Sequence, residues 1–434
     1  MSTATGRGMG SGLILSAPAS GSGKTTLTLG LLRALHRKGA AVRGAKSGPD
    51  YIDPRFHAAA CHAPCPNLDA WAMAPQRLRT LAAGDGLLLI EGAMGLFDGA
   101  PPDGRGATAD LARILGLPTV MIIDTAKTAQ SVAPLVAGFA AHDPQTRVAG
   151  VILNNVGSPR HETMLRRALE PLGLPVLGAV YRQAGMEHPS RHLGLVQAGE
   201  HPDLESYLER VADAVEAAID LPALIALATA LPAPVQGGDN ARHLTPPGQR
   251  IAVASDRAFA FAYPHILTDW QRAGAEVLPF SPLADEPPAP DADFIFLPGG
   301  YPELHAATLG AARQFRAAMQ RARCPVYGEC GGYMVLGEGL TDADGTRHEM
   351  LGLLGLETSF AARKLHLGYR NLHAQGGPFA GAWAAHEFHY ATTLQARGSP
   401  LFQATDAEGN ALPPMGLRSG LVSGSFAHLI DKVK

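Results

Sequence analysis

The chain has 434 residues, a formal net charge of −3 and 46% hydrophobic residues. This length allows two or three domains with real cores, and the balanced charge gives no broad electrostatic basis for binding nucleic acid or a membrane surface. Four cysteines do not suggest a disulfide framework, and no apolar run is long enough to span a bilayer. We therefore expect a globular α/β protein of the cytoplasm with neither nucleic acid nor membrane as a partner.

The first motif is a glycine-rich loop between an apolar strand at Leu13 to Leu15 and a helix from Lys24 to about Lys38. Backbone N–H groups in such a loop, with the helix N-terminus behind them, form a cradle for phosphate oxygens. Lys24 is expected to reach the β- and γ-phosphates of ATP, and the Thr25 hydroxyl is expected to hold Mg²⁺. Pro18 replaces the usual first glycine, which predicts a different entry turn. The predicted ATP-binding residues of this loop are Ala19, Ser20, Gly21, Ser22, Gly23, Lys24, Thr25 and Thr26.

A second strand, near Ala41 to Lys46, leads into a loop that carries Asp50 and Asp53. Open α/β sheets bind ligands at the C-terminal ends of their strands, so these charges are expected beside the phosphate loop. We assign Lys46 to ATP, Asp50 to Mg²⁺, and Asp53 to Mg²⁺ or to the substrate. A turn that uses Pro and Asp for their dihedral angles is the plainer interpretation.

The apolar run that begins at Leu87 ends in Glu91, which predicts a buried parallel strand that delivers an acid to the same edge. In P-loop enzymes an acid at this place completes the Mg²⁺ shell. Asp98 follows on a glycine-flanked turn, where it serves either the substrate or the turn itself.

Two cysteines, Cys61 and Cys65, lie near His57 and His62. The spacing lacks a second ligand pair of the kind that zinc sites use. We interpret these residues as structural.

The α/β alternation continues with predicted strands at Pro118 to Asp124, Val148 to Leu153 and Pro175 to Tyr181. Asn154 directly follows the second of these strands. Its amide offers a donor and an acceptor that suit the edge of adenine, although turn geometry explains an Asn there equally well.

Arg182 and Arg191 lie in a loop that also holds His188 and His192. The arginines are able to clamp substrate carboxylates, and a solvated basic loop is the alternative. A helix from Leu204 to Ile219 is expected to pack back on the sheet.

The composition then changes to a Pro- and Gly-rich stretch, which predicts a linker over residues 233–249 between domains at 1–232 and 250–434. The second half opens with strands at Ile251 to Ala254, Glu276 to Phe280 and Phe294 to Leu297. A single helix is predicted from Ala306 to Arg323.

Cys330 lies in Gly328-Glu-Cys-Gly-Gly332, between a strand and a helix. This is the nucleophile elbow with Cys in place of Ser. The N–H groups of Gly331 and of Gly300 in the preceding glycine turn are predicted to form an oxyanion hole.

A nucleophilic cysteine needs a base. The sequence offers His386 and His389 in one cluster and His428 in another. Spacing alone does not choose between them.

Taken together, these motifs resemble the cobyrinic and hydrogenobyrinic acid a,c-diamide synthases of corrinoid biosynthesis, along essentially the whole chain. The resemblance rests on seven ordered motifs: Ala17-Pro-Ala-Ser-Gly-Ser-Gly-Lys-Thr-Thr26, Gly48-Pro-Asp-Tyr-Ile-Asp-Pro54, Glu91-Gly-Ala-Met-Gly-Leu-Phe-Asp-Gly99, Arg191-His-Leu-Gly-Leu195, Leu297-Pro-Gly-Gly-Tyr-Pro-Glu-Leu304, Gly328-Glu-Cys-Gly-Gly-Tyr333 and His386-Glu-Phe-His-Tyr390.

The resemblance implies an N-terminal P-loop domain with a parallel sheet, similar to dethiobiotin synthetase, and a C-terminal class I glutamine amidotransferase domain. Cys330 matches the family nucleophile and His428 its general base. Ile430 stands where amidotransferase triads usually carry Glu, which leaves open what orients His428.

The implied function is amidation of the a and c acetates of a corrinoid polycarboxylate, with ATP and glutamine as co-substrates and Mg²⁺ as cofactor. A homodimer is left open as the assembly. The alternatives are a cobyric acid synthase, a nickel-sirohydrochlorin a,c-diamide synthase, and a P-loop switch ATPase with an inactive amidotransferase-like appendage.

Overall fold

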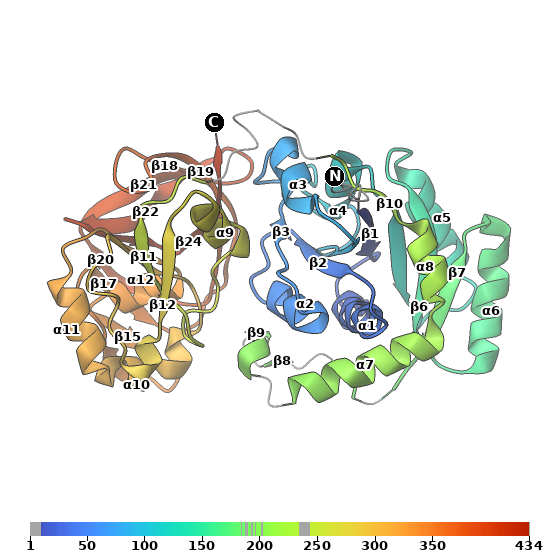
Figure 1. Cartoon of the computed structure of the whole chain (residues 1–434), viewed down its shortest axis with the longest axis horizontal. Coiled ribbons are helices and arrows are strands. Elements are labelled where there is room, and N and C mark those ends of the chain that lie inside the picture. The colour runs from blue at the N-terminus through green and yellow to red at the C-terminus, as the bar shows by residue number, and fades with distance from the viewer. Residues whose placement is uncertain are drawn as a thin grey trace, which may run out of the picture. The chain divides into compact units, whose positions relative to one another are not determined.

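The computed structural model describes residues 10–183, 185–186, 190–191, 194–195, 197–200, 203–233 and 244–433. The chain forms two compact units, Met1–Arg242 and His243–Lys434, which we call unit 1 and unit 2 (Figure 1). Most of the predicted linker, residues 234–243, lies outside the described residues.

Unit 1 is built on a sheet in the order β3-β2-β4-β1-β5-β6-β7, and every pairing along this path is parallel. A short strand, β10, pairs antiparallel with β1. The strand core is apolar on both faces, since Leu13, Ile14 and Leu15 are all fully buried. The strands are β1 (Ser11–Ser16), β2 (Val42–Ser47), β3 (Asn67–Leu68), β4 (Leu87–Glu91), β5 (Thr119–Asp124), β6 (Val148–Val156), β7 (Val176–Tyr181) and β10 (Thr229–Ala230), with a separate pair β8 (Ser190–Arg191) and β9 (Gly194–Leu195).

Helices cover this sheet, and α1 lies beside α7 in Figure 1. The expected helix from Lys24 and the expected parallel sheet are confirmed. Gly39, which has a φ of 79°, follows α1 and allows the chain to turn there. The helices are α1 (Lys24–Arg37), α2 (Asp53–Cys61), α3 (Pro75–Ala82), α4 (Thr108–Leu115), α5 (Val132–His142), α6 (Pro159–Leu169), α7 (Leu204–Ala218) and α8 (Leu221–Leu227), with 3₁₀ turns η1 (Glu170–Leu172) and η2 (Ala198–Glu200).

The loop predicted after β2 is wrong in its second half, because α2 already begins at Asp53. Asp50 Oδ1 accepts hydrogen bonds from the N–H groups of Ile52 (2.7 Å) and Asp53 (2.9 Å), which caps the helix start. Pro54 lies in the first turn, where its missing N–H costs nothing. The helix places Asp53 and His57 one turn apart on the side that meets β2 and β4.

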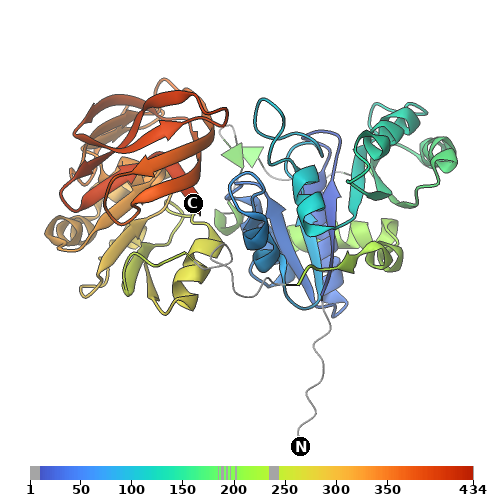
Figure 2. The same cartoon turned by 90° about the horizontal axis from the view of Figure 1, so that it is seen from above.

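Unit 2 contains a sheet in the order β12-β11-β13-β14-β23-β22-β21-β18-β19-β24. The pairings from β12 to β23 are parallel, and those from β23 to β24 are antiparallel. Figure 2 shows the antiparallel part, drawn in red, as a broad curved layer. The strands of this sheet are β11 (Arg250–Ala254), β12 (Glu276–Phe280), β13 (Phe294–Leu297), β14 (Val326–Glu329), β18 (His366–Ala374), β19 (Gly381–His389), β21 (Ser399–Thr405), β22 (Ala411–Ser419), β23 (Val422–Ser425) and β24 (Ala427–Val433).

A smaller sheet in the order β16-β15-β17-β20 and several helices complete unit 2. The single helix predicted from Ala306 to Arg323 is wrong, because Ala312 is extended and divides it in two. Asp285 accepts a hydrogen bond from the N–H of Phe315 (3.0 Å) and so caps the second helix. The remaining elements are β15 (Gly339–Thr341), β16 (Arg347–Glu349), β17 (Gly355–Ser359), β20 (Thr392–Arg397), α9 (Pro264–Arg272), α10 (Ala306–Ala311), α11 (Arg313–Arg321), α12 (Gly331–Leu336), η4 (Pro282–Ala284) and η5 (Pro302–His305).

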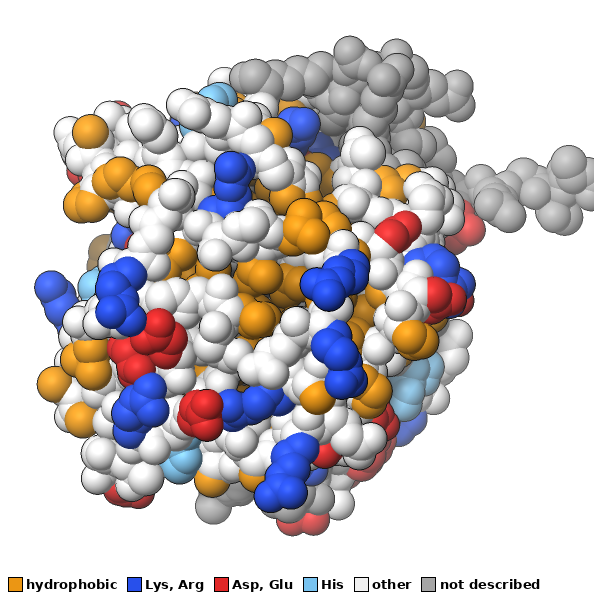
Figure 3. All heavy atoms as spheres, turned by 90° about the vertical axis from the view of Figure 1, so that its left-hand side faces the viewer, with side chains coloured by type: hydrophobic (Ala, Val, Ile, Leu, Met, Phe, Trp, Pro, Cys, Tyr) orange, Lys and Arg blue, Asp and Glu red, His pale blue; other side chains and the backbone are white. Residues whose placement is uncertain are grey.

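The surface mixes charges of both signs. On the face drawn in Figure 3, Lys and Arg side chains are interspersed with Asp and Glu around a central group of hydrophobic side chains. Among the described residues, none of the helices has both the length and the apolar character that a membrane span requires.

Candidate functional site

The phosphate loop of unit 1 is held in a left-handed form by two glycines. Gly21 has a φ of 79° and Gly23 has a φ of 88°, a region that residues with a Cβ rarely enter. Ser22 Oγ donates to the carbonyl of Ala19 (2.9 Å), and Asn154 Nδ2 donates to the carbonyl of Ser22 (3.0 Å). A Cβ on Gly23 would lie 2.2 Å from Asn154 Nδ2. The loop is therefore braced from β6 and closed to larger residues.

Lys24 points its ammonium group back over this loop. Its Nζ donates to the carbonyls of Met94 (2.5 Å) and Ala19 (3.2 Å). Burial lowers the pKa of Lys24 to about 8, although the carboxylate of Glu91 acts in the opposite direction. A phosphate anion at this place would raise the pKa of Lys24 again and so stabilise its charged form.

A cluster of charged groups lies where β2, β4 and the start of α2 meet. Lys46, Asp53 and Glu91 are buried in it, and the half-buried Thr25 joins them. Lys46 Nζ donates to Asp53 Oδ2 (2.6 Å) and to Glu91 Oε1 (2.8 Å). Thr25 Oγ1 donates to Glu91 Oε1 (2.6 Å). Burial alone would favour neutral groups, but Lys46 holds the pKa of Glu91 below its ordinary value, and Asp53 and Glu91 raise that of Lys46. The cluster keeps its charges by pairing them.

His57 belongs to the same cluster, although we interpreted it from the sequence as structural only. Its Nε2 donates to Glu91 Oε2 (2.6 Å), and its Nδ1 lies 3.4 Å from the sulfur of Cys65. The His57 side chain is fully buried. Its contact fixes the second oxygen of Glu91, so both oxygens of that carboxylate have defined directions.

The residues of this cluster fit a magnesium ion. Mg²⁺ prefers oxygen ligands, and Thr25, Asp53 and Glu91 offer a hydroxyl and two carboxylates within one small volume. Asp53 Oδ1 is buried and has no hydrogen-bond partner among the described residues. Asp50 is used differently, because one of its oxygens caps α2, and burial next to Asp53 raises its pKa to about 6.

A cavity of about 570 Å³ lies above the phosphate loop. Most of the predicted loop and cluster residues line it, and Arg182 adds a further cation. Its lining includes Ser20, Gly21, Gly23, Lys24, Thr25, Thr26, Lys46, Glu91, Asn154 and Arg182. A nucleotide triphosphate is the kind of ligand that this charge pattern suits.

The remaining predicted residues of unit 1 are placed as follows. Asp98 Oδ2 accepts a hydrogen bond from the N–H of Gly95 (2.9 Å). This contact stabilises the turn, which is one of the two roles that the sequence left open for Asp98. Arg191 lies in β8, and the neighbouring His188 and His192 lie outside the described residues. The Asn154 amide is engaged with the phosphate loop, so adenine recognition by this residue stays a prediction.

In unit 2, Cys330 lies at a strained turn between β14 and α12. Its φ of 45° and ψ of −105° lie outside the regions that L-residues favour, as expected for a nucleophile elbow. Its N–H donates to the carbonyl of Ser425 (2.8 Å), and its sulfur lies 3.7 Å from the carbonyl oxygen of Phe388. Burial, followed by the carboxylate of Glu303, raises the pKa of the Cys330 thiol.

His428 faces Cys330 across Gly299. A Cβ on Gly299 would lie 2.2 Å from His428 Cε1, 2.9 Å from its Nε2 and 3.2 Å from Cys330 Cβ. Only glycine leaves the space in which thiol and imidazole can meet. Burial lowers the pKa of the fully buried His428 to about 3, so the ring is neutral and able to accept a proton.

The two glycines of the predicted oxyanion hole are neighbours. A Cβ on Gly331 would lie 2.9 Å from the backbone nitrogen of Gly300. The N–H of Gly331 also donates toward the Cys330 thiol. Two backbone donors beside a nucleophile are what a tetrahedral oxyanion requires.

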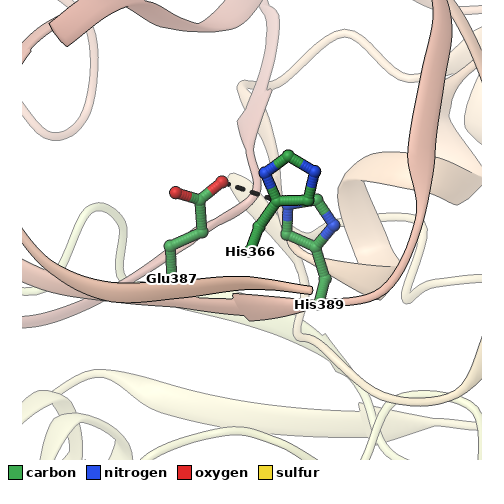
Figure 4. A group of neighbouring side chains, drawn as sticks. All are labelled: His366, Glu387 and His389. Atoms are coloured by element: carbon green, nitrogen blue, oxygen red, sulfur yellow. Dashed lines mark hydrogen bonds and ion pairs between the residues drawn. The ribbon is translucent and has the colours of Figure 1, made fainter. Parts of the chain in front are cut away.

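The sequence cluster of His386 and His389 lies on β19, and His366 on the neighbouring strand β18 approaches it. Figure 4 shows the rings of His366 and His389 stacked, with Glu387 pointing to His389. The ring centroids are 4.6 Å apart, and His389 Nε2 donates to Glu387 Oε1 (3.0 Å). Potential ligand atoms of these three residues lie within 4.8 Å of one another, as a metal would need. Arg370 already pairs with Glu387 (2.8 Å), so the carboxylate is neutralised without an ion.

Two contributors were missed by sequence reasoning. In the sequence, the cysteine neighbours of His57 indicate only a metal site or a structural role. Glu329 was overlooked although it directly precedes Cys330, and its side chain lies beside His428. An acid at the end of a buried strand was the available signal for Glu329, as it was for Glu91.

Two family models match the chain. A CobQ/CobB/MinD/ParA nucleotide binding domain covers residues 13–196, and a CobB/CobQ-like glutamine amidotransferase domain covers residues 250–432. A hydrogenobyrinate a,c-diamide synthase of Brucella anthropi is 55% identical over 430 residues, which cover 97% of this chain and 98% of that protein. Proteins of the same name from Rhizobium meliloti (55% identical) and Mesorhizobium japonicum (52% identical) also cover 97% of this chain, with 99% and 98% of their own lengths.

Proposed function

The chain belongs to the family of the hydrogenobyrinate a,c-diamide synthases, and from this premise we propose that it amidates two acetate carboxylates of a corrinoid with ATP and glutamine. The observation that carries the proposal is the full-length similarity, which includes both units. The two chemical clusters agree with it, because one suits a nucleotide triphosphate and the other a carboxamide. The nitrogen donor is glutamine, and the energy source is ATP.

In unit 2, His428 takes the proton of the Cys330 thiol as the sulfur attacks the side-chain amide of glutamine. The N–H groups of Gly300 and Gly331 stabilise the oxyanion. His428 then returns the proton to the leaving nitrogen, which departs as ammonia and leaves a thioester. Water, activated by His428, releases glutamate and restores the thiol.

In unit 1, the loop from Ala19 to Thr26 holds the phosphates of ATP. A carboxylate of the corrinoid attacks the γ-phosphate, and ADP leaves as an acyl phosphate forms. Lys24 and Lys46 neutralise the charge that develops on the phosphoryl oxygens. Ammonia attacks the acyl carbon and phosphate leaves, which yields one amide for each ATP.

Mg²⁺ would be held by Thr25 and Glu91 together with Asp53, and it would supply positive charge to the β- and γ-phosphate oxygens. We assign Asp53 to the ion in preference to Asp50, which caps α2. Arg182 and Arg191 are proposed to bind substrate carboxylates. Asp98 is assigned to its own turn.

The test is the Cys330→Ala variant, assayed with the corrinoid substrate, ATP and either glutamine or an ammonium salt. Glutamine-dependent amidation should be lost, while ammonia-dependent amidation should persist because unit 1 is intact. If glutamine still supports turnover, Cys330 is not the nucleophile. The mass of the product counts the amides, and four in place of two would indicate a cobyric acid synthase.

A further inference from the structure

We propose that Glu329 is the positioning residue for His428, in place of the Glu that amidotransferase triads usually carry two residues after the histidine. Ile430 occupies that usual position in this chain. Ile430 is fully buried and offers no polar side-chain atom. This inference rests on the proposed glutaminase function of unit 2.

The first step is the distance between the two side chains. Glu329 Oε2 lies 3.7 Å from His428 Nδ1, with both side chains buried. A modest tightening on substrate binding would bring the pair within hydrogen-bond range, as catalytic contacts in unliganded enzymes often require.

The second step is the anchoring of the glutamate. Its other oxygen, Oε1, accepts a hydrogen bond from the N–H of Leu429 (3.0 Å). Leu429 directly follows His428 on β24, so the carboxyl group that lies beside the ring of the base is fixed to the backbone next to it. Glu329 itself ends β14 and directly precedes the nucleophile, which fixes its side chain relative to Cys330.

The third step is the orientation of the imidazole. Nε2 lies toward Gly299 and Cys330, whereas Nδ1 lies toward Glu329. In its ionised form Glu329 can only accept hydrogen bonds, so the proton of the neutral ring then resides on Nδ1, and the lone pair of Nε2 faces the thiol. That tautomer is the one that can take the thiol proton.

A carbonyl competes for this role. The backbone oxygen of Phe261 also accepts a hydrogen bond from the His428 ring. If Phe261 oriented the imidazole, the identity of residue 329 would matter little for proton transfer. The two possibilities therefore make different predictions for substitutions at Glu329.

The informative substitution is Glu329→Gln, because Gln has one acceptor where Glu has two. If the Gln oxygen still accepts the hydrogen bond from the N–H of Leu429, the Gln NH₂ group faces His428 and donates to Nδ1. The proton of the ring then moves to Nε2, which can no longer accept from Cys330. Since an imidazole held in the wrong tautomer costs roughly 10⁴-fold in kcat in serine hydrolases, we expect a loss of about 10² to 10⁴-fold here.

The experiment measures glutaminase kcat and KM for the full chain above pH 8, where Glu329 is ionised, together with ammonia-dependent amidation. Glu329→Gln should lower kcat by that factor with little change in KM and should retain ammonia-dependent amidation. Glu349→Gln, the same change at an exposed position of unit 2, is the matched control and should leave both unchanged. A kcat of Glu329→Gln within about threefold of wild type would overturn the proposal in favour of Phe261.

A spectroscopic measurement keeps the test independent of how well the variant folds. In wild-type protein labelled with ¹⁵N-histidine and kept above pH 8, where Glu329 is ionised, the His428 signals, assigned by their loss in His428→Ala, should show a protonated Nδ1 and a bare Nε2. A protonated Nε2 in the resting wild-type enzyme at that pH would contradict the proposal. A failure of the proposed glutaminase function gives a different result. If Cys330 is not the nucleophile, Cys330→Ala retains the glutaminase activity of the wild type, whatever the result at Glu329.

Discussion

The two reactive clusters solve the problem of buried ionisable groups in opposite ways. In unit 1, Lys46, Asp53 and Glu91 are buried and charged, because each cation meets an anion within 2.8 Å. In unit 2, Cys330 and His428 are buried and neutral, and burial raises the pKa of Glu329 to about 8. The comparison teaches that the first cluster is prepared in advance for an ionic ligand. The second acquires charge only when a proton moves during reaction.

The largest expected effect comes from removing one charge from the buried cluster of unit 1. Glu91→Gln leaves Lys46 with only Asp53 and removes the anion that faces His57, and breaking a buried ion pair costs about 3 kcal/mol. We expect a loss of this size in the free energy of opening of unit 1, measured by native-state hydrogen exchange of peptides from β2 and β4.

The control for this experiment is Glu205→Gln, which removes the exposed partner of Arg33. Because Glu205 itself is exposed and Arg33 keeps its second partner Glu209, the loss should be only about 0–1 kcal/mol, so exchange should change little. Equal effects of the two substitutions would show that the buried cluster is not held by its charges.

The pH dependence of stability tests whether the buried Glu329 of unit 2 is neutral in the folded protein. The folded-state pKa of Glu329, about 8, lies above its unfolded value near 4.3, so its contribution to stability is complete below pH 4 and is lost as the pH rises toward 8. Between pH 6.5 and 8 the loss attributable to this group is about 2 kcal/mol. Hydrogen exchange of β14 and β24 in wild type and Glu329→Gln, compared at each pH, isolates this group.

Wild type should lose stability relative to Glu329→Gln as the pH rises through this range. Other groups near the site, among them Glu303 with a pKa raised to about 7 by burial, titrate in both proteins and cancel in the difference. A pH-independent difference would mean that Glu329 is already ionised in the folded protein.

The sequence was sufficient to place a residue where that place depends on a single strand. Lys46, Glu91 and Cys330 each lie at or directly after the C-terminal end of a predicted strand, and the parallel strands of each sheet bring such ends to the same edge. It failed where contacts depend on tertiary packing. The second helix after Ala312 is capped by Asp285, which lies about 30 residues earlier in the chain. The contact between His428 and Glu329 joins two strands whose residues are 99 positions apart in the sequence.

The smallest expected effect concerns Asn154, where the sequence left adenine recognition and turn geometry open. The structure adds a third role, because the amide donates to the carbonyl of Ser22 and so braces the phosphate loop. A neutral hydrogen bond of this kind contributes about 0.5–1.5 kcal/mol. Asn154→Ala should therefore raise the KM for ATP by about two- to tenfold with little change in kcat.

Comparison of ATP with GTP separates bracing from base recognition. A residue that only braces the loop acts on the phosphates, which the two nucleotides share, so Asn154→Ala should raise both KM values by the same factor. Asn155→Ala is the matched control, since its amide donates to Asp124 (3.0 Å) and not to the loop. If instead the preference for ATP over GTP collapsed in Asn154→Ala alone, this side chain would read the base, because a lost brace cannot distinguish adenine from guanine.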